Sequence, residues 1–347
     1  MGFAAAGISS SRASAAWHVV DASTMTAVNA ASDDFIRRIK MMTDSNKSRL
    51  EQLTTEARNP LTHDLDNLSA LELVKLINSE DRKIAAAVEK VAGPIAEAID
   101  RIAAAFSRGG RLIYVGAGTS GRLGVLDAVE CPPTFNTDPD MVVGVMAGGA
   151  EGLVRAIEGA EDSRSLGQSD LQDLDLNRCD VVVGIAASGR TPYVLGALEY
   201  ARQAGAFTIG FSCNQEAEIQ QYADLNIIPL VGPEILSGST RLKAGTATKM
   251  VLNMLTTGAM VRIGKTFSNL MVDVRATNTK LIERAIRIIA EVTGCDTSDS
   301  RALLNRCNGE VKTAIVSYKN AVSPDEARSQ LDSVDGHLRR ALELNVS

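Results

Sequence analysis

The sequence has few aromatic residues, no block of basic residues and no long apolar run, and each shortage excludes a class of protein. Aromatic residues make up only 4% of the 347 residues, which argues against a surface that stacks the bases of single-stranded nucleic acid. The net charge is −6, and without a Lys/Arg cluster the electrostatic footprint of a nucleic-acid-binding protein is missing. No apolar run approaches the roughly 18 residues of a membrane span. We therefore expect neither nucleic acid nor a membrane as a partner.

Cysteines and histidines are too scattered for a disulfide framework or a metal site. The five cysteines are odd in number and form no C-x-x-C pair, and the three histidines lie far apart in sequence. This usage fits a reducing cytoplasm and predicts that no metal is bound.

Apolar residues make up 45% of the chain, enough for a buried core. The start of the chain is rich in Ala and Ser and lacks the charged start and apolar stretch of a secretory signal. We expect residues 1–45 to form a disordered extension.

The pattern after this extension changes from helical to alternating. Ser69 and Glu72 form a capping box before apolar residues at helical spacing, and the helical region extends from Leu68 to Phe106. Short apolar runs then alternate with helical stretches, which indicates a doubly wound parallel sheet flanked by helices. The expected strands are Leu112–Val115, Met141–Met146, Val181–Ala186, Thr208–Phe211 and Asn226–Leu230, and the expected helices are Gly121–Glu130, Gly152–Glu161 and Pro192–Ala204.

Helices dominate the last third of the chain. We expect one long helix over Ser239–Ile263, another over Asn278–Val292, and two or three short helices in the tail, with breaks at Gly294 and Gly309. The predicted domains are therefore residues 46–293 and a small helical subdomain, residues 294–347.

Two strand-to-helix loops can hold a phosphate. The first, Gly116-Ala-Gly-Thr-Ser-Gly121, matches G-x-G-x-x-G, but the next expected strand ends without the carboxylate that a dinucleotide ribose requires. The second, from Ala186 to Pro192, offers the hydroxyls of Ser188 and Thr191, a glycine at 189 and a helix start. Backbone N–H groups and the dipole at a helix start favour an anion. Two such loops in one sheet suit a sugar phosphate, although each hydroxyl could instead serve as a helix cap.

Further candidates for substrate binding flank these loops. Thr119, Ser120 and Gly121 belong to the first loop and Arg122 follows it, whereas Ser188, Gly189, Arg190 and Thr191 belong to the second. Ser239 and Lys243 stand at the start of the expected long helix, where the lysine could neutralise a phosphate or a carboxylate or simply lie on the helix surface.

These motifs together resemble a known family. GAGTSGR, LDAVECPP, EGAEDS, GIAASGRTPYV, GSTRLKAGTATKMVLNM and NLMVDV occur in the order and spacing of the N-acetylmuramic acid 6-phosphate etherases, and the likeness extends from Thr55 to about Gly294. The resemblance implies a sugar-isomerase (SIS) type domain, a homodimer, no metal or organic cofactor, and cytoplasmic work in recycling cell-wall amino sugars. It also implies cleavage of the ether between C3 of the sugar and D-lactate, and a small ubiquitin-associated-like (UBA-like) tail.

The resemblance also implies two catalytic carboxylates. Glu130 matches the acid that protonates the leaving lactate, and Glu161 matches the second carboxylate, taken as the base, although the two roles could be exchanged. Glu130 stands at the end of its expected helix, before Pro132. A straight helix places it ~15 Å from the loop that holds the phosphate. The helix must therefore bend, or Glu130 must serve the other subunit; we favour an active site shared across the dimer.

Two rival functions remain on the same fold. An aldose–ketose isomerase needs a base at C2 but no acid at C3. A sugar-phosphate sensor needs no catalytic carboxylates, and the transcription regulators of this kind need a basic reader that the N-terminal helices lack.

Overall fold

The computed structural model describes residues 53–274 and 279–344. The extension expected over residues 1–45 lies outside the described residues. Within the described ranges, no helix combines the length and the apolarity that a membrane span requires.

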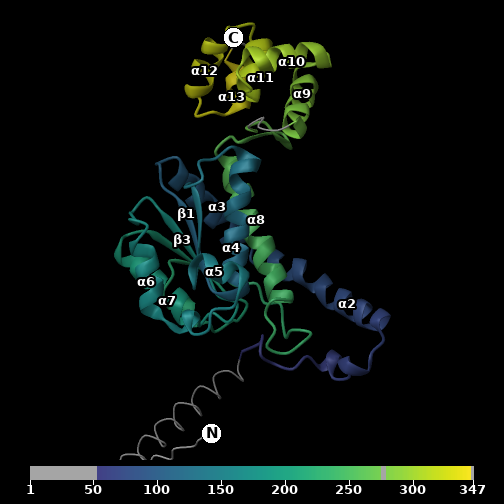
Figure 1. Cartoon of the computed structure of the whole chain (residues 1–347), viewed down its shortest axis with the longest axis vertical. Helices are drawn as coiled ribbons and strands as arrows, with labels where there is room; N and C mark the ends of the chain where they lie inside the picture. The colour runs from purple at the N-terminus through teal and green to yellow at the C-terminus, as the bar shows by residue number, and fades with distance from the viewer. Residues whose placement is uncertain (1–52, 275–278, 345–347) are drawn as a thin grey trace, which may run out of the picture. The chain divides into compact units, whose positions relative to one another are not determined.

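A five-stranded parallel sheet forms the centre of the larger part of the chain, as predicted (Figure 1). Its strands are β1 (Leu112–Gly116), β2 (Val142–Met146), β3 (Val181–Ile185), β4 (Phe207–Phe211) and β5 (Leu225–Ile227). The strand order is β2-β1-β3-β4-β5. Every residue of β1 and β3 is buried, because helices cover both faces of a parallel sheet.

Helices flank the sheet and connect its strands. They are α2 (Ala70–Glu89), α3 (Ala92–Phe106), α4 (Gly118–Phe135), α5 (Gly149–Val154), α6 (Arg164–Gln172), α7 (Pro192–Gln203) and α8 (Lys243–Arg262). Two short 3-10 turns precede α2, η1 (Pro60–Thr62) and η2 (Leu65–Asn67), and two lie between later elements, η3 (Ala160–Asp162) and η4 (Glu218–Gln221).

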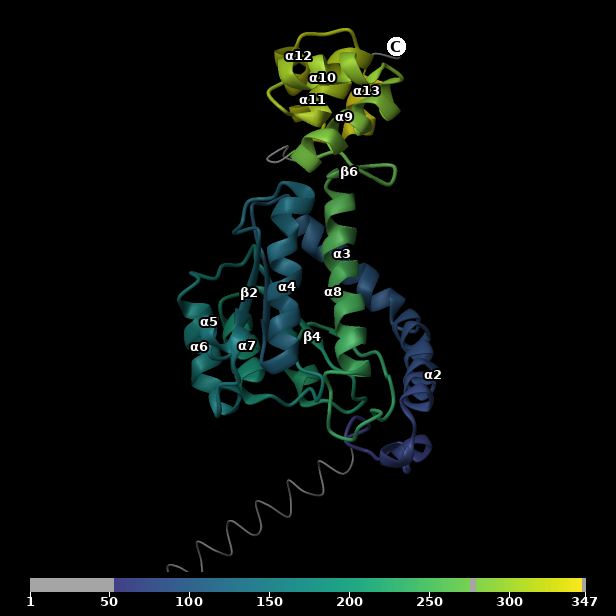
Figure 2. The same cartoon turned by 45° about the vertical axis from the view of Figure 1, so that its right-hand side comes forward.

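The two faces of the sheet build two apolar cores. Leu112 and Tyr114 of β1 point into a core shared with α2, α3, α4 and α8, whereas Ile113 and Val115 point into a core shared with α6 and α7. This alternation is the period-two geometry of a strand. Figures 1 and 2 show α6 and α7 on one side of the sheet and α8 running beside α4 on the other.

A third core belongs to the C-terminal elements. These are β6 (Thr266–Phe267), β7 (Leu270–Met271), α9 (Thr279–Thr293), α10 (Thr297–Arg306), α11 (Val311–Lys319), α12 (Pro324–Asp332) and α13 (Leu338–Glu343). Its buried residues begin at Val272 and include Ile286 and Ile289 of α9. The domain boundary that the sequence predicts between residues 293 and 294 therefore separates α9 from the core to which this helix contributes. The likeness of the tail to a ubiquitin-associated domain stays a prediction.

Candidate functional site

The two predicted phosphate loops lie side by side at the carboxyl edge of the sheet. β1 and β3 are neighbours, and Gly116 at the end of β1 is paired with Ile185 at the end of β3. From β1 the chain continues to β2 on one side, and from β3 it continues to β4 on the other. In doubly wound sheets the ligand crevice lies where the strand order reverses in this way.

The first loop is shaped by two facing glycines. A Cβ at Gly116 would lie 2.6 Å from the nitrogen of Gly121, and a Cβ at Gly121 would lie 2.6 Å from the oxygen of Gly116. The first turn of α4 can therefore pack directly on the end of β1. Its N-cap residue, Ala117, has no side chain that could cap the helix, so the N–H groups at this helix start stay available for an anion. Within the described ranges, the half-buried hydroxyls of Thr119 and Ser120 have no hydrogen-bond partner.

In the second loop, Gly189 is required by both backbone and space. It has φ +69°, and a Cβ there would lie 2.3 Å from the Cβ of Ala217 and 2.7 Å from the Oγ of Ser212. The Oγ of Ser188 accepts a hydrogen bond from the Arg190 N–H at 3.3 Å. Thr191 is the N-cap residue of α7, but its side chain makes no capping bond. The start of α7 thus also lacks a side-chain cap.

Glu130 is exposed on α4, and the helix continues through it. The sequence predicted that the helix ends before Pro132 and Pro133, but α4 includes both prolines and ends at Phe135. Glu130 is therefore more than a turn from the helix end. Since α4 is continuous from Gly118, ten residues separate Ser120 from Glu130, or ~15 Å along the axis.

Glu161 lies in η3 and is exposed. The single helix predicted over Gly152–Glu161 is wrong: α5 ends at Val154, and η3 follows after a break. Gly159, with φ +74°, lies in this break. In the part of the chain that the structure describes, no hydrogen bond or ion pair joins Glu130 or Glu161 to either loop.

The two arginines beside the loops have different surroundings. The Arg122 guanidinium donates to the backbone oxygens of Gly152, Leu153 and Arg155 at 2.7, 3.0 and 3.1 Å. These contacts hold the end of α5, so Arg122 has a structural role in addition to the predicted one. The Arg190 side chain has no such partner among the residues described, and its charge is free to meet an anion.

Lys243 is not on the helix surface. It is 1% exposed, and its Nζ lies 2.8 Å from Oε2 of Glu80, which is 2% exposed. Glu80 also accepts hydrogen bonds from Lys83 and from Nδ2 of Asn59. Burial alone would raise the pKa of Glu80, but the bonds from these partners outweigh it and lower the pKa to about 2. Lys243 therefore already has a buried counter-charge.

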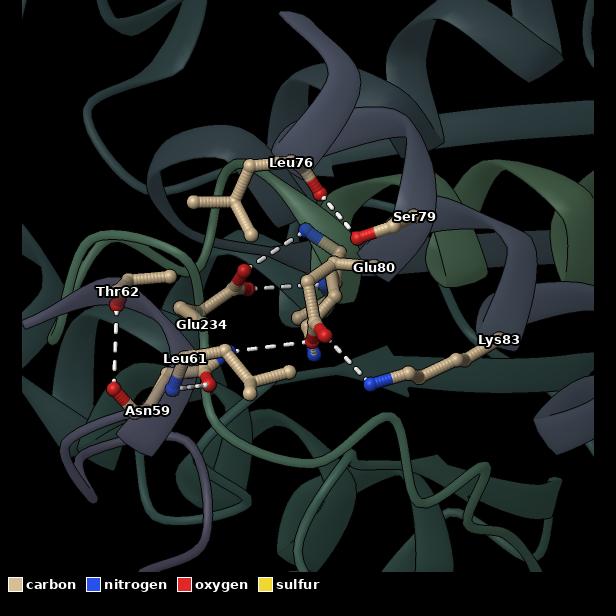
Figure 3. A network of polar contacts seen from close by, with 10 residues as sticks. Asn59, Leu61, Thr62, Leu76, Ser79, Glu80, Lys83 and Glu234 are labelled. Carbon is tan, nitrogen blue, oxygen red and sulfur yellow. Dashed lines mark hydrogen bonds and ion pairs between the residues drawn. The ribbon is translucent and has the colours of Figure 1, made fainter. Parts of the chain in front are cut away.

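The start of α8 is also neutralised from within. The fully buried carboxylate of Glu234 accepts the N–H groups of Lys243 and Ala244, each at 2.9 Å (Figure 3). This helix start lies beside the first loop, since a Cβ at Gly245 would be 3.6 Å from Cγ2 of Thr119. Half-buried Ser239 lies four residues before Lys243, in the loop that leads into α8. The sequence indicates Ser239 and Lys243 as candidates for substrate binding but gives no sign of Glu80, which is 163 residues from Lys243.

Metal-binding side chains do not gather in the described ranges: they hold no group of three or more His, Cys, Asp or Glu residues placed to bind an ion.

Comparison with known proteins adds to this geometry. Residues 94–202 match the N-terminal SIS domain of glucokinase regulatory protein, residues 167–258 match the SIS domain, and residues 268–321 match the C-terminal lid domain of glucokinase regulatory protein. A protein of Rhodopirellula baltica named N-acetylmuramic acid 6-phosphate etherase is 61% identical over 295 residues, covering 85% of this chain and 98% of that protein.

Two further relatives extend this similarity. A protein of the same name from Aliivibrio fischeri is 54% identical, covering 85% of this chain and 99% of its own length. N-acetylmuramic acid 6-phosphate etherase 2 of Vibrio cholerae serotype O1 is also 54% identical, covering 87% of this chain and 99% of that protein.

Proposed function

Because the chain belongs to the N-acetylmuramic acid 6-phosphate etherase family and is an enzyme, we propose that it cleaves the ether between C3 of N-acetylmuramic acid 6-phosphate and D-lactate. The products are N-acetylglucosamine 6-phosphate and D-lactate. The observation that carries the proposal is the pair of uncapped helix starts at neighbouring strand ends, which suit the 6-phosphate. The enzyme works in the cytoplasm, in the recycling of cell-wall amino sugars.

The reaction is an elimination followed by an addition of water. Opening of the sugar ring gives an aldehyde at C1, which acidifies the proton on C2. A carboxylate removes that proton, and the C3–O bond breaks as a carboxylic acid protonates the departing lactate oxygen. Water then adds across the double bond, placing hydroxyl on C3 and a proton on C2. One carboxyl must be ionised and the other protonated at the same pH.

We assign the acid to Glu130 and the base to Glu161. Ser188, Gly189, Arg190 and Thr191 of the second loop bind the phosphate together with the first-loop residues, which are Thr119, Ser120, Gly121 and Arg122. Ser239 also contributes to substrate binding. Lys243 contributes indirectly, because it is paired with Glu80 and stands at the start of α8, beside the first loop.

The active site is shared between two subunits of a homodimer. Glu130 is ~15 Å along α4 from Ser120, too far for a hexose phosphate bound at its own loops. The surface around Glu130 supports this proposal: Leu126 and Val129, on the same helix, are 50% and 57% exposed. A second copy that covers these apolar side chains would bring its own phosphate loops towards Glu130.

The deciding experiment measures release of D-lactate from N-acetylmuramic acid 6-phosphate. In D₂O the sugar product should carry one deuterium at C2, because the proton lost in elimination returns from solvent. Fructose 6-phosphate is the matched alternative substrate. Its isomerisation, with no lactate release from the muramic sugar, would contradict the proposal and favour the isomerase.

A further inference from the structure

Asn214 joins the second phosphate loop to a segment that precedes the whole sheet. This asparagine is 1% exposed and follows β4. Its Nδ2 donates to the oxygen of Ala187 at 2.9 Å and to Oγ1 of Thr55 at 3.1 Å, while its Oδ1 accepts the N–H of Thr55 at 3.3 Å. Thr55 is itself fully buried. A buried amide with both ends bonded fixes the relative position of the segments it connects.

The oxygen of Ala187 receives more than this one bond. It also accepts the N–H of Cys213 at 3.0 Å and the hydroxyl of Ser212 at 3.3 Å. The N–H and C=O of a trans peptide point in opposite directions. Three donors from residues 212–214 hold the oxygen of Ala187 towards that segment. The N–H of Ser188, on the same peptide, therefore points away from it. Among the described residues this N–H has no acceptor.

Residues 53–59, here called the N-terminal strap, are fastened at their other end as well. The oxygen of Ala57 accepts the hydroxyl of Ser237 at 3.1 Å. Asn59 bonds to Glu80 at 3.1 Å, and Glu80 pairs with Lys243, the first residue of α8 (Figure 3). The first turn of α8 lies against Thr119 of the first phosphate loop. The strap is thus linked to the second loop through Asn214, and to the first loop through Glu80, Lys243 and the first turn of α8.

We propose that Thr55 and Asn214 are positioning residues for the substrate phosphate. Through the carbonyl of Ala187 they aim the Ser188 N–H, and with it the second loop, at the anion, and the N-terminal strap holds this arrangement together. The inference rests on the proposed function, because it concerns the same phosphate site.

Threonine variants test the proposal with little disturbance of the fold. Thr55→Val removes only the hydroxyl that accepts from Asn214, and Thr55→Ser retains it. We expect Thr55→Val and Asn214→Ala to raise the KM for N-acetylmuramic acid 6-phosphate roughly tenfold, about the loss of one hydrogen bond to a charged group. The kcat should stay within about twofold, and Thr55→Ser should behave as the wild type. The dissociation constants of inorganic phosphate and N-acetylglucosamine 6-phosphate should rise in parallel.

Thr208→Val is the matched control. Thr208 is fully buried like Thr55, and its hydroxyl is bonded to Asp224 at 2.8 and 3.1 Å, but it lies near the amino end of β4, away from the loops. It should lower the Tm and leave the KM and both dissociation constants unchanged. If Thr55→Val lowers the Tm in the same way without weakening phosphate binding, Thr55 has only a structural role and the proposal is wrong.

The binding measurements separate this inference from the proposed function. A wild type that releases no lactate but binds either phosphate compound, with weaker binding in Thr55→Val, would overturn the etherase activity and leave the positioning role supported. A wild type that binds neither compound at millimolar concentration would overturn the phosphate site and this inference with it. If Asn214→Ala does not fold, the three threonine variants decide the outcome.

Discussion

Glu130 can be replaced without disturbing the packing around it, because its side chain is exposed on α4 and makes no hydrogen bond or ion pair with another described residue. We expect Glu130→Gln to lower lactate release by roughly 10²–10⁴-fold, the usual contribution of one general acid or base. The Tm should hardly change, as for most surface substitutions. Glu89→Gln, an exposed change on α2, is the control. Wild-type release by Glu130→Gln would exclude Glu130 from catalysis.

Solvent exchange distinguishes the roles of the two glutamates. A variant that lacks only the acid can still remove and return the C2 proton, so it should exchange that proton with D₂O although lactate stays attached. We expect this of Glu130→Gln and not of Glu161→Gln, as followed by mass spectrometry. The reverse pattern would exchange the two assignments.

We expect the hydroxyls of the second loop to contribute to substrate binding rather than to the chemical steps. Ser188→Ala combined with Thr191→Val should raise the KM at least tenfold, since a hydrogen bond to a charged group contributes about 1.5–3 kcal/mol. An unchanged KM would return both hydroxyls to a local role, such as the bond from the Arg190 N–H to Ser188.

Among the elements, the link between α2 and α8 through Glu80 and Lys243 should show in the pH dependence of stability. The folded pKa of Glu80, about 2, lies below its ordinary value of 4.5. Because this pKa is depressed in the folded state, the ionised Glu80 carboxylate adds to the free energy of unfolding above pH 4.5. This contribution is lost as the pH falls through about 2. Glu80→Gln leaves Lys243 buried without its partner charge. It should cost about 3–5 kcal/mol at pH 7, and the gap to the wild type should narrow in acid.

Denaturant unfolding at pH 7 and pH 3 measures this gap. Glu97→Gln is the control, because Glu97 is 53% exposed and lies 3.6 Å from Arg101 in an exposed pair, of a kind that contributes little. A Glu80→Gln protein as stable as the wild type at pH 7 would contradict the role assigned to the buried pair.

The sequence predicts helix starts correctly where interactions between neighbouring residues determine them. The capping box of Ser69 and Glu72 begins α2 as expected, and Pro192 opens α7. The helix end expected before Pro132 was wrong because proline removes only its own N–H and restricts its neighbours, whereas packing of α4 on α8 and the sheet carries the helix onward. The antiparallel pair β6–β7 was missed, since two residues a strand give no periodicity.

In the candidate site too, the residues that local sequence motifs reveal differ from those that only the tertiary fold brings together. The two loops could be recognised because a strand end, glycines and a helix start adjoin in sequence. The partners of Lys243 could not be recognised, since burial and pairing between Glu80 and Lys243 depend on the tertiary fold. Asn214 could not be recognised either, since an isolated asparagine in a sequence gives no sign of the backbone carbonyl to which it donates.

At the scale of the whole molecule, a shared active site predicts complementation. At substrate concentrations well below the KM, Glu130→Ala protein and a Ser188→Ala, Thr191→Val protein should each be at least tenfold less active than the wild type, because one half of the site is altered in each. In an equal mixture with subunit exchange, half of the dimers are mixed and each has one intact site. About a quarter of wild-type activity should therefore return. Light scattering gives the oligomeric state, and tagged subunits confirm the exchange. No recovery after confirmed exchange would place Glu130 in the site of its own subunit.

The N-terminal strap also fixes when the site can be completed during synthesis. The bonds from Thr55 to Asn214 and from Ala57 to Ser237 span 159 and 180 residues, and the pair of Glu80 with Lys243, to which the strap is joined through Asn59, spans 163 residues. At about 5–20 residues per second, a ribosome needs roughly 8 to 36 seconds to reach each of these partners after it has made the first residue of the pair. Through that interval the polar groups of Thr55, Ala57 and Glu80 stay bonded to water, and contacts of such long range close slowly. Thr55 and Asn59 are made before every strand of the sheet, yet the site that they hold cannot assemble until Lys243 has been made.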